Sequence, residues 1–186
     1  MFGARLFFFT TFLYLSLLAG FFLDENLNHG TYYDWISVNR DPIISFSNNF
    51  LDIFLNYEKF GHRHSPVYLI FLSFILKTGV EIEYLRLIHF HLCLTLIFLF
   101  YKCLLIKFSK INKNLLILLS LVIFLSPTFR SIAIWPDSRI PGLIFFTLSI
   151  LYFLKFNQNF KIKFVWLCTL SLIISSYISP NFSIFI

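Results

Sequence analysis

Residues 5–25, RLFFFTTFLYLSLLAGFFLDE, place one arginine before a predominantly apolar run from Leu6 to Leu23, and two adjacent carboxylates after it. The run has about the length that a helix needs to cross a bilayer. A secretory signal peptide is the alternative, but its apolar core usually spans about 7 to 15 residues before a small-residue cleavage site. Because Ala19-Gly20 is followed by further apolar residues, we expect an uncleaved first membrane helix.

The composition indicates that lipid is the main solvent of this chain. Of its 186 residues, 58% are hydrophobic and 21% aromatic, including 27 phenylalanines, which is more apolar surface than one soluble core of this size buries. The net charge of +6 does not indicate a nucleic-acid partner, because the lysines cluster at predicted membrane borders. Cys93, Cys103 and Cys168 lie in apolar stretches without zinc-type spacing, so we predict buried thiols and no metal site.

Four further apolar stretches follow a long polar segment. With the first at about residues 5–23, they predict spans at about 86–106, 114–134, 140–156 and 164–186, and an outer loop at 24–85. Pro180 interrupts the last of them. We therefore predict one all-α membrane domain over residues 1–186, a multi-pass transmembrane helical bundle.

The outer loop contains two predicted helices that do not span. Asp41-Pro42 is typical of a helix start, and apolar residues from Ile43 to Tyr57 then recur at helical spacing. Ser65-Pro66 repeats the pattern before residues 67–76, a stretch too short to cross a bilayer. We expect both to be amphipathic helices lying in the membrane interface.

Charge is distributed unequally between the connections. All nine acidic residues fall in alternate connections, whereas the others carry only basic charge, as Lys102, Lys107, Lys110, Lys113, Lys155, Lys161 and Lys163. Lysine excess in short connections marks the cytoplasmic face. We therefore expect a multi-pass protein of the cell membrane with a cytoplasmic N-terminus and acidic outer loops. Transport is disfavoured, because the charged residues lie at span ends.

Asp24-Glu25 is the first candidate site, because it directly follows the first span. A partly desolvated carboxylate there can act as a general base toward an acceptor hydroxyl or amine. The simpler interpretation, which stays open, is that the two acids cap a helix end on the outer face.

A second candidate lies in the short loop at residues 135–139. Asp137 with Arg130 and Arg139 places one anion and two cations between two spans, and arginine is suited to bidentate phosphate binding. An ion-paired loop that only orients two helices explains the same residues.

Histidines and aromatic residues supply weaker signals. Arg63 and His64 precede the second loop helix and are candidate anion contacts, whereas His62 and His64 form only a weak metal pattern. His89 and His91 could face a cavity or lie at the headgroup level. Tyr68, like Tyr32, Tyr33 and Trp35, could stack on a sugar or simply pack at the interface.

The order of these motifs resembles the type-C glycosyltransferases, and most closely their protein mannosyltransferase and aminoarabinose transferase branch. The resemblance covers nearly the whole chain. It is carried by short motifs: Asp24-Glu25 after the first span, His64-Ser65-Pro66-Val67-Tyr68, Lys77-Thr78-Gly79, Tyr84-Leu85-Arg86-Leu87, and Ser126-Pro127 through Asp137-Ser138-Arg139.

The resemblance implies transfer of a sugar from a polyprenyl-phosphate donor to an acceptor at the extracytoplasmic face. It implies that Asp24 is the catalytic carboxylate, that Glu25 supports it, and that Asp137 and Arg139 help to bind the donor phosphate or a metal. Arg63, His64 and Arg130 are further predicted phosphate contacts. No cofactor is specified by the sequence.

Members of this family usually carry more spans than the five predicted here. The chain therefore also fits an N-terminal portion of such an enzyme or a truncated pseudo-enzyme. A non-catalytic membrane subunit with a larger membrane partner is the alternative from another class, and a polysaccharide polymerase or a flippase would also place charged groups on outer loops.

Overall fold

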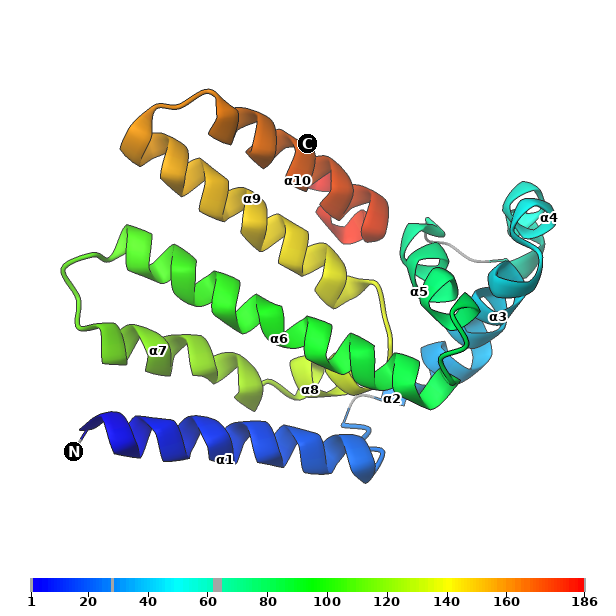
Figure 1. Ribbon diagram of the computed structural model, residues 1–186, viewed down its shortest axis with the longest axis horizontal. Helices are drawn as coiled ribbons and strands as arrows, with labels where there is room; N and C mark the ends of the chain where they lie inside the picture. The colour runs from blue at the N-terminus through cyan, green and yellow to red at the C-terminus, as the bar shows by residue number, and fades with distance from the viewer. Residues whose placement is uncertain (1, 28, 62–64, 186) are drawn as a thin grey trace.

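The computed structural model describes residues 2–27, 29–61 and 65–185, and over these residues the chain is helical, with no strand. Five helices lie side by side in the order α10, α9, α6, α7 and α1, while the short helices α2 to α5 gather at one end of this layer (Figure 1). The all-α prediction is therefore confirmed for the described residues.

Three of the described helices are long and apolar enough to cross a membrane: α1 (Phe2–Phe22), α6 (Ile82–Lys107) and α9 (Arg139–Asn159). They contain 21, 26 and 21 residues, which at about 1.5 Å per residue gives roughly 30 Å or more. Large aromatic side chains point away from the protein on these helices, such as Phe8 on α1 at 70% exposure and Phe98 on α6 at 57%. Such a surface is suited to lipid.

The predicted span at 114–134 is not one straight helix. It comprises α7 (Lys113–Leu121), the 3₁₀ turn η3 (Val122–Leu125) and α8 (Pro127–Ile134), and the axis bends by 69° between η3 and α8. Ser126 adopts an extended backbone, and its hydroxyl accepts a hydrogen bond from the Phe129 amide. Because proline lacks an N–H and disfavours a helical residue before it, Ser126-Pro127 starts a new helix instead of continuing the old one.

The last apolar stretch also divides. The helix α10 (Lys163–Ile178) ends before Ser179-Pro180, and the 3₁₀ turn η4 (Pro180–Phe185) packs back on α9. Phe182 stacks on Phe146, with ring centroids 5.3 Å apart. This close return requires Gly142, since a Cβ there would lie 2.7 Å from the Ser179 side chain and 2.9 Å from the Phe182 ring.

The polar segment between α1 and α6 is more continuous than its turn signals indicate. The helix α2 (His29–Asp34) runs through a π-helical turn, η1 (Trp35–Asn39), into α3 (Arg40–Asn48), so no helix starts at Asp41-Pro42. A proline inside an α-helix clashes with the carbonyl four residues before it, and for Pro42 that residue, Val38, lies in the wider π-turn, which accommodates the ring. The helix then breaks at Asn49, before α4 (Phe50–Leu55) and the 3₁₀ turn η2 (Tyr57–Phe60).

The second loop helix, α5 (Val67–Lys77), covers the predicted residues 67–76. It packs against α3, and the pair buries Ile43 and Phe46 of α3 with Leu72 of α5. Packing of these apolar faces places the polar segment over the ends of α6, α8 and α9.

The fold separates the two kinds of connection. The N-terminus, the α6–α7 connection and the α9–α10 connection lie at one end of the layer, and α2 to α5 with α8 lie at the other (Figure 1). Lys110 and Lys161 belong to the first end, whereas Asp24, Asp34 and Asp137 belong to the second. The charge asymmetry of the sequence is therefore also a separation in space.

Candidate functional site

Asp24 pairs with Arg86 at the acidic end of the layer. Asp24 lies two residues after the end of α1 with φ of 51°, a left-handed conformation that aspartate tolerates better than most residues. Its Oδ1 accepts a hydrogen bond of 2.8 Å from Arg86, which also donates to Glu83 at 2.8 Å. The Arg86 guanidinium lies 3.9 Å from the centroid of the Trp135 ring, so α1, α6 and the α8–α9 loop meet there.

Glu25 pairs with Arg130 of α8 through two hydrogen bonds, whereas Asp24 accepts one from Arg86. Arg130 donates from Nε to Oε1 at 2.6 Å and from a terminal nitrogen to Oε2 at 2.5 Å. Both side chains are largely buried, at 14% and 18% exposure, where such bidentate pairs are strongest. Arg130 also donates to the Ser16 carbonyl at 3.1 Å, and the Trp135 indole donates to the Glu25 carbonyl at 3.0 Å. The contact leaves no room at Gly20, where a Cβ would lie 2.3 Å from Glu25 Oε2.

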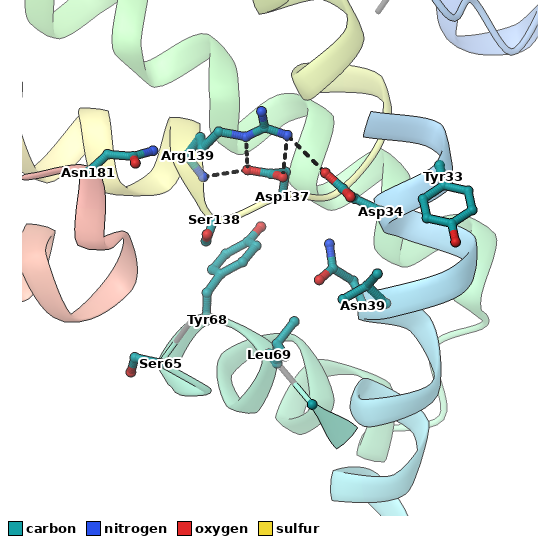
Figure 2. A pocket seen from close by; sticks show the side chains of 12 residues that line it. Tyr33, Asp34, Asn39, Ser65, Tyr68, Leu69, Asp137, Ser138, Arg139 and Asn181 are labelled. Atoms are coloured by element: carbon teal, nitrogen blue, oxygen red, sulfur yellow. Dashed lines mark hydrogen bonds and ion pairs between the residues drawn. The ribbon is translucent and has the colours of Figure 1, made fainter. Parts of the chain in front are cut away.

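Asp137 and Arg139 form the third ion pair, in the loop that leads into α9. Arg139 donates from Nε and from a terminal nitrogen to the two Asp137 oxygens, each at 2.8 Å, and its amide donates to Oδ1 at 2.7 Å. The same guanidinium reaches Asp34 of α2 at 3.3 Å (Figure 2). Asp34 was not among the predicted site residues, because nothing in the sequence connects α2 with this loop.

Asp34, Asp137 and Arg139 line a polar cavity of about 580 Å³. Its wall is formed by α2, η1, α5, the Asp137–Arg139 loop and the start of η4 (Figure 2). The polar side chains lining it include Asp34, Asn39, Tyr68, Asp137, Arg139 and Asn181. We call this space the polar cavity.

A second hollow of about 610 Å³ adjoins the first and is almost entirely apolar. It lies against α6, α8, α9 and η4, and its lining includes Phe100, Ile132, Leu143, Phe146, Ile150 and Phe182. Arg139 and Asn181 line both spaces. The polar cavity and this apolar groove therefore meet at one arginine and one asparagine.

Tyr68 and His89 form a buried polar pair on the wall of the polar cavity. The Tyr68 hydroxyl is hydrogen-bonded to Nδ1 of His89, and Nε2 of His89 lies 2.8 Å from the Ile132 carbonyl oxygen. Burial is the main cause that raises the pKa of the Tyr68 phenol well above its ordinary value. His89 and Tyr68 occur in the sequence as two ordinary residues among several histidines and tyrosines, so their pairing had no local signal.

The predicted site residues are thus distributed over separate groups. Asp137 and Arg139 line the polar cavity, whereas Asp24 lines another hollow with Glu83 and Arg86. Glu25 and Arg130 hold each other beside Trp135. Arg63 and His64 lie outside the described residues. Arg86 was named as the start of a span and within the Tyr84-Leu85-Arg86-Leu87 motif but not as a site residue, although an arginine near the start of an apolar helix is itself a signal for a paired charge.

No cluster of three or more histidine, cysteine, aspartate or glutamate side chains suited to a metal ion occurs among residues 2–27, 29–61 and 65–185. The chain matches no protein-family model, no curated protein and no solved structure. The resemblance to type-C glycosyltransferases therefore stays a prediction that is carried by the short motifs alone.

Proposed function

We propose that this chain is a multi-pass membrane glycosyltransferase, or a module of one, that moves a sugar from a polyprenyl-phosphate donor to an acceptor at the extracytoplasmic face. The observation that carries the proposal is the junction of the polar cavity with the apolar groove at Arg139. A lipid-linked sugar phosphate consists of a polar sugar, an anionic phosphate and an apolar tail. This order matches the order of the polar cavity, Arg139 and the apolar groove. The groove would take the isoprenoid, Arg139 the phosphate, and the polar cavity the sugar.

The proposed orientation places the N-terminus in the cytoplasm. The lysine-rich connections at the N-terminal end of the layer would then face the cytoplasm, and the polar cavity would face out. In this arrangement α3 and α5 lie along the outer membrane interface, where they pack on each other, α5 also contacts α6 and α10, and their polar faces meet water. Donor lipid would reach the groove sideways from the bilayer, and acceptor would arrive from the aqueous side.

The proposed transfer is a displacement at the anomeric carbon. The bond from that carbon to the phosphate oxygen breaks, and the electron pair leaves with the phosphate. A bond to the acceptor oxygen or nitrogen forms, and the acceptor proton passes to a carboxylate. The resemblance assigns this base to Asp24, whereas Asp137 and Asp34 are carboxylates that line the polar cavity.

The first experiment measures sugar transfer by the purified chain in lipid nanodiscs. The donors are a panel of radiolabelled polyprenyl-phosphate sugars, and the acceptor is an envelope extract. Asp24→Asn, Asp137→Asn and Asp34→Asn distinguish the three candidate bases, since each substitution removes a carboxylate and keeps its size. Loss of transfer in Asp24→Asn alone supports the role implied by the resemblance, and full activity in that variant removes the assignment.

Donor binding tests the phosphate contact separately. Arg139→Gln should weaken retention of polyprenyl phosphate by about tenfold, because a charge-assisted contact from the terminal nitrogen that Asp137 and Asp34 do not occupy is lost. Arg40→Gln is the matched control, as Arg40 is exposed on α3 and lines neither the polar cavity nor the apolar groove. Equal retention by both variants would contradict the proposal.

A non-catalytic membrane subunit is the second candidate, and one observation favours it. Each predicted catalytic carboxylate already holds an arginine: Asp24 with Arg86, Glu25 with Arg130, and Asp137 with Arg139. Two of these pairs join distant segments, as structural ion pairs do. Co-purification with a larger membrane protein, together with absence of transfer until that partner is added, would support this candidate.

A further inference from the structure

His89 is completely buried, with 0% exposure, although histidine is a polar residue. Two contacts compensate for this burial. Nε2 lies 2.8 Å from the Ile132 carbonyl oxygen, and Nδ1 is bonded to the Tyr68 hydroxyl. The Cys93 thiol also lies 3.3 Å from Nε2. A buried neutral histidine is stable when both ring nitrogens are satisfied in this way.

These partners determine the direction of each hydrogen bond. A carbonyl oxygen can only accept, so Nε2 of His89 carries the hydrogen and donates to Ile132. In a neutral imidazole the other nitrogen, Nδ1, then has only a lone pair. The Tyr68 hydroxyl must therefore donate to Nδ1. Its own hydrogen is used inside the protein, and its oxygen is left to act as an acceptor.

The Tyr68 oxygen points toward the polar cavity, in the direction of Asp137 and Ser138 (Figure 2). An oxygen that can only accept attracts a hydroxyl or amine hydrogen and disfavours an anion. Arg139, at the start of α9, has the opposite preference through its second terminal nitrogen, since Nε and the first already donate to Asp137 and Asp34. The two residues thus divide the cavity into a part suited to phosphate and a part suited to a hydroxyl group.

We propose that Tyr68, held in one orientation by His89, recognises a single hydroxyl group of the sugar that enters the polar cavity. Tyr68 is the specificity-determining residue and His89 is a positioning residue that acts through it. This inference rests on the proposed function, because it assumes a lipid-phosphate sugar as ligand. Beyond that function, it identifies the residue that selects the sugar, Tyr68, and the chemical group that is selected, a hydroxyl.

The test compares binding of geranyl phosphate with binding of geranyl-phosphate mannose, glucose and galactose to the full chain in nanodiscs. We expect at least one sugar to bind more tightly than geranyl phosphate alone. Tyr68→Phe keeps the ring and removes the oxygen, so it should reduce this gain by about fivefold to tenfold. Its affinity for geranyl phosphate should stay unchanged. Tyr177→Phe, the same change at an exposed tyrosine of α10 that lines neither the polar cavity nor the apolar groove, is the control.

Fluorinated sugars locate the hydroxyl group. Replacing a ligand hydroxyl by fluorine removes its donor hydrogen. At one ring position this replacement should reduce the affinity of the native chain for the sugar by about the same factor as Tyr68→Phe does. The two changes together should lose no more than either alone. His89→Asn, which keeps an acceptor near the Nδ1 position, should retain more of the sugar gain than His89→Leu. The comparison of His89→Asn with His89→Leu separates an effect on the orientation of Tyr68 from an effect on packing. It also tests the proposal if Tyr68→Phe folds poorly.

The possible failures are distinct. If neither geranyl phosphate nor its sugar derivatives bind the chain, the proposed function is refuted and this inference is refuted with it. If geranyl phosphate binds and the sugar gain is the same in Tyr68→Phe as in the native chain, only the role of Tyr68 is refuted.

Discussion

Gly20→Ala provides a quantitative test of the Glu25–Arg130 contact. The new methyl group would lie 2.3 Å from Glu25 Oε2 and 3.1 Å from Arg130, so the carboxylate must move. The two charge-assisted hydrogen bonds of this largely buried pair contribute about 2–3 kcal/mol. Alanine, however, is favoured over glycine within a helix by at most about 1 kcal/mol. The net effect should be a loss of about 1–2 kcal/mol in the free energy of unfolding.

The assay is unfolding of the purified chain by SDS titration in mixed micelles, followed by circular dichroism. Gly3→Ala is the matched control, because it lies in the same helix and a Cβ there meets nothing within 4 Å. The same substitution at Gly20 is also measured in a Glu25→Ala background. Without the Glu25 carboxylate the contact at 2.3 Å is removed and only the flexible end of Arg130 lies near the methyl group, so Gly20→Ala should there become neutral or stabilising.

This reversal of sign is the decisive result. A Gly20→Ala variant as stable as the native chain would show that Glu25 is free to move and that the pair is not a fixed element. An equal loss of stability in both backgrounds would attribute the effect to some other neighbour of Gly20.

Three further predictions follow from other contacts. Gly142→Ala should lower the free energy of unfolding by about 1–3 kcal/mol in the same titration, because its Cβ would overlap the turn that follows α10. Trp135→Phe should lower it by about 1–2 kcal/mol, since it removes the indole hydrogen bond to the Glu25 carbonyl and part of the guanidinium–ring contact. In a cysteine-free background, Leu27→Cys and Lys110→Cys should react with an impermeant thiol reagent from opposite sides of the membrane; labelling of both from one side would contradict the proposed orientation.

Much of the fold could be predicted from local sequence. Helix ends followed proline signals at Ser65-Pro66 and Pro180, since proline restricts its own backbone wherever it occurs. The same signals failed at Asp41-Pro42, where the chain was already helical and a π-turn absorbed the proline. At Ser126-Pro127 the proline was identified, but the bend of 69° that it introduces was not.

The apolar runs and the alternation of charge between connections were determined by the sequence alone, because both depend on neighbouring residues and on the thickness of a bilayer. Which arginine holds Asp24 and which holds Glu25 was decided only by the tertiary structure: Glu25 and Arg130 are 105 residues apart, and nothing local selects that partner over Arg86 or Arg139. The Tyr68–His89 pair, and the junction of polar cavity and apolar groove at Arg139, also depend on how α5, α6, α8 and α9 pack. Packing geometry is a property of several helices at once, and no periodicity within one helix encodes it.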